Sequence, residues 1–173
     1  RSSFGRIPSG TTPEIDAIAA AFNQAGFRTV ASREIQTEEW SKFVVFVALL
    51  PLSALARVET YRMLQDPGLA RIGANLLKEM AQLTDRLGIR LEDAGAMAKV
   101  DTVIRSDIDA AVESLRQSGL ALAARGATGH KVSTLQDIEH GRRLEIEEIL
   151  GYATRKAAEF GLKLPTVETC YHL

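Results

Sequence analysis

The sequence predicts a mainly α-helical protein that begins with a short α/β segment. After residue 34, apolar residues recur three and four positions apart, which is typical of helices that bury one face. Before it, two short apolar stretches flank one helical segment, the pattern of a strand–helix–strand unit. The 173 residues are 46% hydrophobic and 25% charged, which excludes collagen, a disulfide scaffold and a disordered chain.

Charge and residue usage exclude several other classes. The formal net charge of −1 gives no sign of a nucleic acid or an anionic membrane as partner. Cys170 is the single cysteine, and the three histidines lack ligand spacing, so we expect no disulfide and no metal. The apolar stretch over residues 43–56 is too short to cross a membrane and contains Pro51, which favours a buried helix. These features predict a cytoplasmic protein.

The first 34 residues predict two strands, over residues 3–8 and 27–32, around one helix. Thr12 is a suitable N-cap and Pro13 suits the first helical position. Gly26 is a natural end for this helix. The start of the chain has no apolar core of a signal peptide and no initiator Met, so we expect it to be part of a longer protein.

The remaining residues predict a series of helices. Thr37 opens the first, which Pro51 should kink or end. The second should run from Pro67 to Leu87 between an Asp66 cap and Gly88, with Ile72, Leu76, Met80 and Leu83 buried. Further helices are expected over residues 107–125 (weakened by Gly119), around Asp137 (capped by Ser133 or Thr134), over residues 145–160, and after Thr166.

Two features invite a chemical interpretation. The glycine-rich loop over residues 126–131 resembles half of a phosphate-binding loop but lacks its first glycine and its Ser or Thr, so phosphate binding is disfavoured. Lys42 lies beside Trp40 at the head of the most apolar helix. A desolvated lysine can donate a proton near neutrality, but spacing alone favours a lysine whose ammonium stays in water.

Two motifs, about ninety residues apart, are more specific together. The first is Trp40-Ser41-Lys42, followed by LPLSAL over residues 50–55. The second is STLQDI over residues 133–138, followed by Gly-Arg at 141–142 and Glu-Ile-Glu at 145–147. In this order they resemble the C-terminal domain of the ketopantoate reductase (2-dehydropantoate 2-reductase) family. The opening residues are similar to the end of that family's nucleotide-binding domain.

The resemblance implies a fold and a function. Residues 1–34 would be a remnant of a Rossmann domain, and residues 35–173 a helical substrate and dimerisation domain of the 6-phosphogluconate dehydrogenase C-terminal type. The family reduces a 2-oxo acid, ketopantoate, with NADPH in pantothenate biosynthesis. NADPH would be bound mainly by the missing N-terminal domain, so this chain alone should catalyse nothing. A homodimer is expected by analogy of fold.

The resemblance also assigns roles to three residues. Lys42 would be the general acid that protonates the carbonyl oxygen. Ser133 would bind the substrate carboxylate, and Glu145 would hydrogen-bond the nascent hydroxyl or orient the lysine. We therefore expect the three side chains to converge on one concave site.

The sequence departs from the family at two positions. The family usually has asparagines four and eight residues after its lysine, and here these positions are Phe46 and Leu50. If both line the site, they predict a 2-oxo acid with an apolar side chain. The alternative is that both pack in the core. A second alternative for the whole chain is a non-catalytic helical interaction or dimerisation module.

Overall fold

The computed structural model describes residues 2–93 and 97–173. The chain forms two compact units, Arg1–Trp40 and Ser41–Leu173. Helix α2 (Ile35–Ala56) begins in the first unit and continues through the second. The division after Trp40 lies within α2, and Glu38 in the first turn of α2 binds the strands of the first unit. The domain boundary expected after residue 34 stays a prediction.

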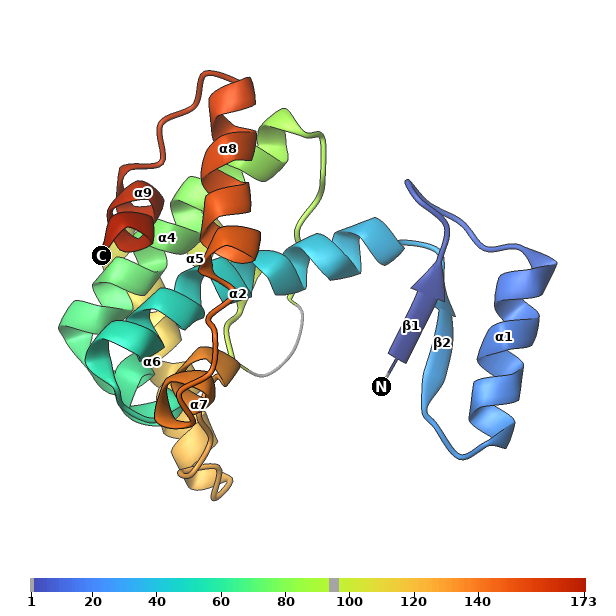
Figure 1. The fold of residues 1–173 in the computed structure, drawn as a ribbon, viewed down its shortest axis with the longest axis horizontal. Coiled ribbons are helices and arrows are strands. Elements are labelled where there is room, and N and C mark those ends of the chain that lie inside the picture. The colour runs from blue at the N-terminus through green and yellow to red at the C-terminus, as the bar shows by residue number, and fades with distance from the viewer. Residues whose placement is uncertain (1, 94–96) are drawn as a thin grey trace. The chain divides into compact units, whose positions relative to one another are not determined.

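The first unit is the strand–helix–strand fragment that the sequence predicts. Strand β1 (Ser2–Gly5) pairs in parallel with β2 (Thr29–Ser32), and α1 (Pro13–Gln24) connects them (Figure 1). The expected cap is confirmed, since the Thr12 side chain accepts a hydrogen bond from the Ile15 N–H at 3.4 Å. A two-stranded parallel sheet is a marginal structure by itself.

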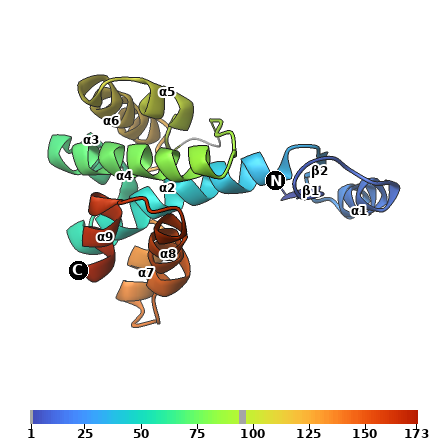
Figure 2. The ribbon, with the colours of Figure 1, turned by 90° about the horizontal axis from the view of Figure 1, so that it is seen from above.

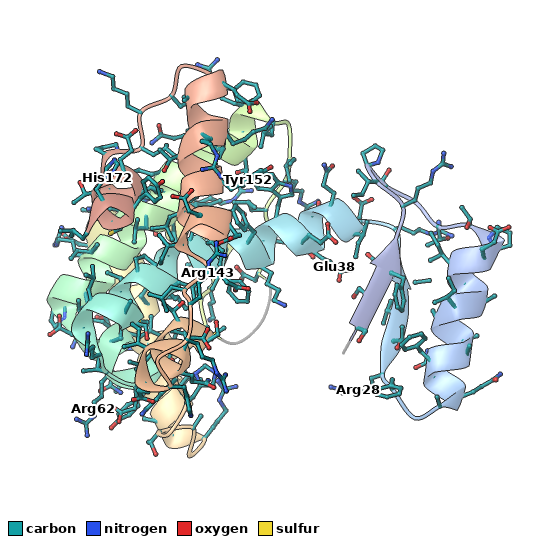
Figure 3. The ribbon with its side chains drawn as sticks, in the orientation of Figure 1. Arg28, Glu38, Arg62, Arg143, Tyr152 and His172 are labelled. Atoms are coloured by element: carbon teal, nitrogen blue, oxygen red, sulfur yellow. The ribbon has the colours of Figure 1, made fainter. Side chains whose placement is uncertain are left out.

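Side-chain contacts join the two strands of this unit to α1 and to the start of α2. The Phe22 ring of α1 lies 5.3 Å from that of Phe4 in β1, so the helix packs on the sheet. The hydroxyls of Ser3 and Ser32 donate to the Glu38 carboxylate at 2.7 and 2.6 Å. Both strands are thereby linked to the start of α2 (Glu38 is labelled in Figure 3).

The second unit is helical over its described residues, which confirms the predicted fold class. In Figure 2, α7 and α8 lie on one side of α2, and α5 and α6 lie on the other. Its elements after α2 are α3 (Thr60–Gln65), α4 (Pro67–Arg86), α5 (Val100–Arg105), α6 (Ile108–Ala124), α7 (Ser133–Glu139), the π-helical turn η1 (Glu147–Gly151), α8 (Tyr152–Glu159) and α9 (Pro165–His172). Its largest fully buried side chains come from several helices: Val44, Val47, Leu49, Met63, Leu76, Leu77, Met80, Leu83, Leu115, Leu135, Leu150 and Leu164.

Helix α2 is longer than the sequence indicated, and of the two effects expected of Pro51, a kink or an end, the end is wrong. It does not end at Pro51 but continues to Ala56, since burial of the surrounding apolar side chains outweighs the backbone hydrogen bond that proline removes. With 22 residues it is also long and apolar enough to span a membrane by length and composition, which the shorter stretch over residues 43–56 did not suggest. More than half of its most apolar window is buried inside the protein, as in a core helix.

Helix α4 has nearly the predicted bounds. The Asp66 side chain caps it by accepting from the Leu69 N–H at 2.8 Å. Leu76, Met80 and Leu83 are fully buried as expected. Ile72 was expected to be buried too, and this is wrong: it is 38% exposed. It lines an apolar hollow together with residues of α2 and α9, and this hollow leaves part of its side chain uncovered.

The sequence did not predict α3 and α5. Each has six residues, too few to show a helical period, and such short helices depend on tertiary contacts. In α3, Met63 is fully buried, and the Thr60 N–H donates to the His130 carbonyl at 3.0 Å. At the end of α5, Lys78 of α4 donates to the Ile104 carbonyl at 3.3 Å and also binds the Ser106 carbonyl.

Gly119 allows α6 to pack closely against α3. A Cβ at this position would lie 2.8 Å from the Tyr61 carbonyl oxygen and 2.9 Å from the Leu64 Cβ. In an open helix, Gly→Ala would stabilise by about 1 kcal/mol. Here we expect Gly119→Ala to lower the free energy of unfolding by about 1–3 kcal/mol, because the two backbones would have to separate.

The measurement is chemical denaturation of the wild-type protein and of the Gly119→Ala variant. Gly129→Ala is the matched control, because a Cβ there would have no neighbour within 4 Å and the backbone φ is not positive. An increase in stability with Gly119→Ala would contradict the close packing of α6 on α3.

Candidate functional site

Lys42 is held on a rigid part of α2. The preceding residue, Ser41, is fully buried, and its hydroxyl accepts a hydrogen bond from the Glu92 N–H at 2.9 Å. The following residue, Phe43, stacks edge-on against Tyr152 at the start of α8, with ring centroids 5.7 Å apart (Tyr152 is labelled in Figure 3). The backbone of Lys42 is therefore fixed on both sides, while its side chain is exposed.

The ammonium of Lys42 has an aromatic neighbour. Its Nζ lies 5.1 Å from the centroid of the Phe46 ring, one turn further along α2. Within residues 2–93 and 97–173, no carboxylate lies within ion-pair distance of this ammonium. Its N–H groups therefore remain available for a ligand.

Phe46 and Leu50 differ in their surroundings. Phe46 is half-buried, with its ring beside the ammonium of Lys42. Leu50 is only 4% exposed and packs in the core, as the alternative reading expected of both residues. The apolar surface beside Lys42 thus comes from Phe46. Substrate contact by either residue stays a prediction.

Ser133 is the first residue of α7. The expectation that Ser133 or Thr134 caps this helix is wrong: Val132 is the N-cap residue and no side chain caps the helix. Val132 and Thr134 are both buried, which turns the Thr134 side chain inward and Ser133 outward. The exposed Ser133 hydroxyl has no hydrogen bond to the part of the chain that the structure describes.

Glu145 lies at the beginning of the helix that becomes α8. Its carbonyl accepts from the Ile149 N–H at 3.1 Å, and the π-helical turn η1 follows it. Such turns are frequent at functional sites, and the sequence pattern gave no sign of this one. At Gly151 a Cβ would lie 2.8 Å from a carboxylate oxygen of Glu147, so the Glu147 side chain lies over this glycine.

Neighbouring carboxylates are engaged within the protein. Glu147 accepts from Arg155 at 2.9 Å and from the Tyr171 hydroxyl, and these two donors lower the pKa of its carboxyl group. Glu148 pairs with Arg143 at 3.0 Å (Arg143 is labelled in Figure 3). Glu145 is exposed and has no such partner among the described residues. Its carboxylate is therefore the available one of the three.

Three exposed residues that are distant in sequence present available polar groups: Lys42, Ser133 and Glu145. The Phe43–Tyr152 contact places α8 against the part of α2 that carries Lys42. Figure 2 shows α7 on the same side of α2 as α8. That the three side chains line one concave site stays a prediction, and the placement of their helices supports it.

Glu79 has a role that the sequence did not indicate. It is 9% exposed, and its carboxylate accepts from the backbone N–H groups of Thr166 and Val167, at 2.9 and 3.1 Å, and from the Thr166 hydroxyl. It therefore binds the N-terminus of α9 to α4. The available signal was an acidic residue within the buried stripe of α4.

The glycine-rich loop over residues 126–131 is engaged in the fold. The Thr60 hydroxyl and the His130 Nδ1 are hydrogen-bonded at 2.9 Å, and the His130 carbonyl accepts from the Thr60 N–H. This docks the loop on α3. Across residues 2–93 and 97–173, no group of three His, Cys, Asp or Glu side chains is placed to hold a metal ion.

Comparison with known families decides the identity of this helical unit. Residues 34–173 match the family described as "Ketopantoate reductase PanE/ApbA C terminal". The chain belongs to the ketopantoate reductase family. This agrees with the resemblance of the motifs around Lys42 and Ser133.

Curated relatives extend the match beyond the helical domain. A 2-dehydropantoate 2-reductase from Archaeoglobus fulgidus is 26% identical over 169 residues, which cover 98% of this chain and 50% of the relative. One from Halobacterium salinarum is 26% identical over 97% of this chain and 48% of its own length. The chain thus spans about half the length of the relatives it matches.

Solved structures show the same fold. The 2-dehydropantoate 2-reductase from Methylococcus capsulatus is 26% identical, with a TM-score of 0.73 over 98% of this chain and 52% of its own. D-mandelate dehydrogenase, in a ternary structure with NADH and anilino(oxo)acetate, has a TM-score of 0.76 at 18% identity, over 99% of this chain and 64% of its own. The second match concerns the fold alone.

Proposed function

We propose that this chain is the substrate-side half of an NADPH-dependent reductase of 2-oxo acids, of the ketopantoate reductase type. The observation that carries the proposal is the exposure of the polar side chains of Lys42, Ser133 and Glu145. These residues lie in the motifs that resemble those of the family, within the matched residues 34–173. Each presents an exposed polar group that no described carboxylate or backbone group occupies.

The chemistry follows from these three side chains. When bound, NADPH supplies a hydride to the carbonyl carbon of the substrate. Negative charge then develops on the carbonyl oxygen, and Lys42 Nζ stabilises this charge and donates a proton to the oxygen. Ser133 donates a hydrogen bond to the substrate carboxylate. Glu145 accepts one from the new hydroxyl or from the ammonium of Lys42.

Binding of NADPH is assigned mainly to residues outside this chain. The sequence contains no G-x-G-x-x-G motif, whose glycines let the backbone approach a pyrophosphate. The first unit supplies two parallel strands and one helix of an α/β domain. We therefore expect the isolated chain to be inactive and the full-length protein to be a reductase.

Two further properties are part of the proposal. We expect a cytoplasmic homodimer, and one neighbour of the same fold is described as a dimeric ketopantoate reductase from Staphylococcus aureus. Sedimentation analysis of the full-length protein tests the dimer. An apolar hollow of about 370 Å³, which Leu52, Leu55 and Leu173 help to line, would suit the alternative of an interaction module. An active dimer with substrate-dependent turnover would exclude that alternative.

The substrate preference is testable. Where the family offers an amide, this chain presents the Phe46 ring beside Lys42. A substrate hydroxyl there would lose a hydrogen bond, at a cost of about 1–3 kcal/mol. We expect the full-length enzyme to reduce a 2-oxo acid with an apolar side chain, such as 2-oxoisovalerate, with a kcat/KM about 5- to 150-fold above that for ketopantoate.

The variant for this test is Phe46→Asn alone, because Leu50 is in the core and an asparagine there would disturb folding. Phe46→Asn should improve ketopantoate turnover relative to 2-oxoisovalerate. Equal or better use of ketopantoate by the wild-type enzyme would contradict the predicted preference, while the reductase activity itself would stand.

A further inference from the structure

We propose that Phe46 is a positioning residue that holds the ammonium of Lys42 for proton transfer. This inference rests on the proposed function. The resemblance implies that the family usually has an asparagine at this position, where this sequence has Phe46.

The geometry of α2 brings the two side chains together. Residues four apart lie on the same face of a helix. The Lys42 Nζ lies 5.1 Å from the centroid of the Phe46 ring, within the distance of about 6 Å at which a cation is attracted by a ring face. Phe46 is half-buried within the folded unit, whereas the lysine side chain is exposed. The ring is thus the fixed partner, and the lysine is the side chain that needs to be ordered.

Three other lysines of the chain, Lys78, Lys131 and Lys156, are held by oxygen atoms. Lys156 also lies near a ring, 5.8 Å from the centroid of Phe160, but it pairs with Glu159 at 2.6 Å as well. Lys131 pairs with Glu139 at 2.5 Å. For Lys42, the ring of Phe46 is the one partner among residues 2–93 and 97–173.

A ring suits a proton donor better than a carboxylate does. A carboxylate paired with the ammonium before the substrate binds would take one of its three N–H groups, so fewer would remain for the substrate oxygen and for Glu145. The face of a ring attracts the positive charge without accepting a directed hydrogen bond, so the ammonium can turn its N–H groups toward the substrate. Without a partner, the long lysine side chain would sample many rotamers, and its ordering would have to occur in each turnover.

The experiment uses the full-length protein with NADPH and the preferred 2-oxo acid. Phe46→Leu keeps an apolar side chain but removes the ring, and Phe46→Tyr keeps the ring. We expect Phe46→Leu to lower kcat about fivefold with little change in KM, and Phe46→Tyr to retain kcat. Phe160→Leu is the matched control, since it removes the equivalent ring from Lys156, and it should leave kcat unchanged.

A second readout does not depend on activity. In carbon-13-labelled lysine spectra, ring current should shift the Lys42 ε-methylene resonance upfield. Phe46→Leu should abolish this shift, and Phe46→Tyr should keep it. Wild-type kcat in Phe46→Leu would overturn the proposal, and so would an equal loss in both variants, which would indicate packing. A wild-type protein that reduces no 2-oxo acid would overturn the proposed function, and the positioning role with it, even where the upfield shift is observed.

Discussion

Replacing Glu79 with glutamine is expected to lower the free energy of unfolding by about 2–4 kcal/mol, because a buried acceptor of several hydrogen bonds is lost. The carboxylate of Glu79 faces three donors at the start of α9: the N–H groups of Thr166 and Val167 and the Thr166 hydroxyl. Glutamine replaces one oxygen with an NH₂ group, which would point at a donor. The negative charge that favours the N-terminus of α9 is lost as well.

Chemical denaturation measures the change, and hydrogen exchange at Thr166 and Val167 locates it. Glu168→Gln is the matched control, since its carboxylate also lies at the start of α9 but, among the described residues, accepts only from the Leu164 N–H, at 3.2 Å. We expect this control to change stability by less than about 1 kcal/mol. If Glu79→Gln behaves like Glu168→Gln, the carboxylate does not secure α9.

Local signals in the sequence predicted the parts of the fold that local chemistry determines. Thr12 and Asp66 cap helices as expected, because a cap needs only its own side chain and the next backbone N–H groups. Ile72 has the same spacing as Leu76 but is exposed, since periodicity gives the face of a helix and not how far its neighbours cover it. Gly119 illustrates the same limit, because only the packing of α3 against it explains why a glycine is needed there.

The candidate site, too, was only partly predictable from the sequence. The motifs gave Lys42, Ser133 and Glu145 through resemblance to a family, whereas spacing alone favoured a lysine whose ammonium stays in water. The helical period placed Lys42, Phe46 and Leu50 along one face of α2, but Leu50 is covered and Phe46 is not. The contacts that differ between these two positions are tertiary, so one sequence could not distinguish them.

The largest catalytic effect is expected from Lys42→Met in the full-length protein. Methionine keeps an unbranched side chain that is one atom shorter, and it removes the ammonium. A positioned proton donor contributes about 10²- to 10⁴-fold to the rate, so kcat with NADPH and a 2-oxo acid should fall by that factor. Because the Lys42 side chain is exposed and has no described carboxylate partner, the melting temperature should change little.

Lys156→Met is the control for this prediction, because Lys156 also lies near a ring four residues further along the chain, that of Phe160 at the end of α8. Its kcat should stay at the wild-type value.

Ser133→Ala should mainly raise KM, since its hydroxyl is assigned to the substrate carboxylate and binds it in the ground state and in the transition state alike. If Lys42→Met retains kcat while Ser133→Ala raises KM, the site binds the substrate but another group donates the proton. A loss of kcat confined to Lys42→Met would instead assign proton donation to Lys42. Its backbone is fixed in α2 beside Ser41, and its ammonium has no described carboxylate partner.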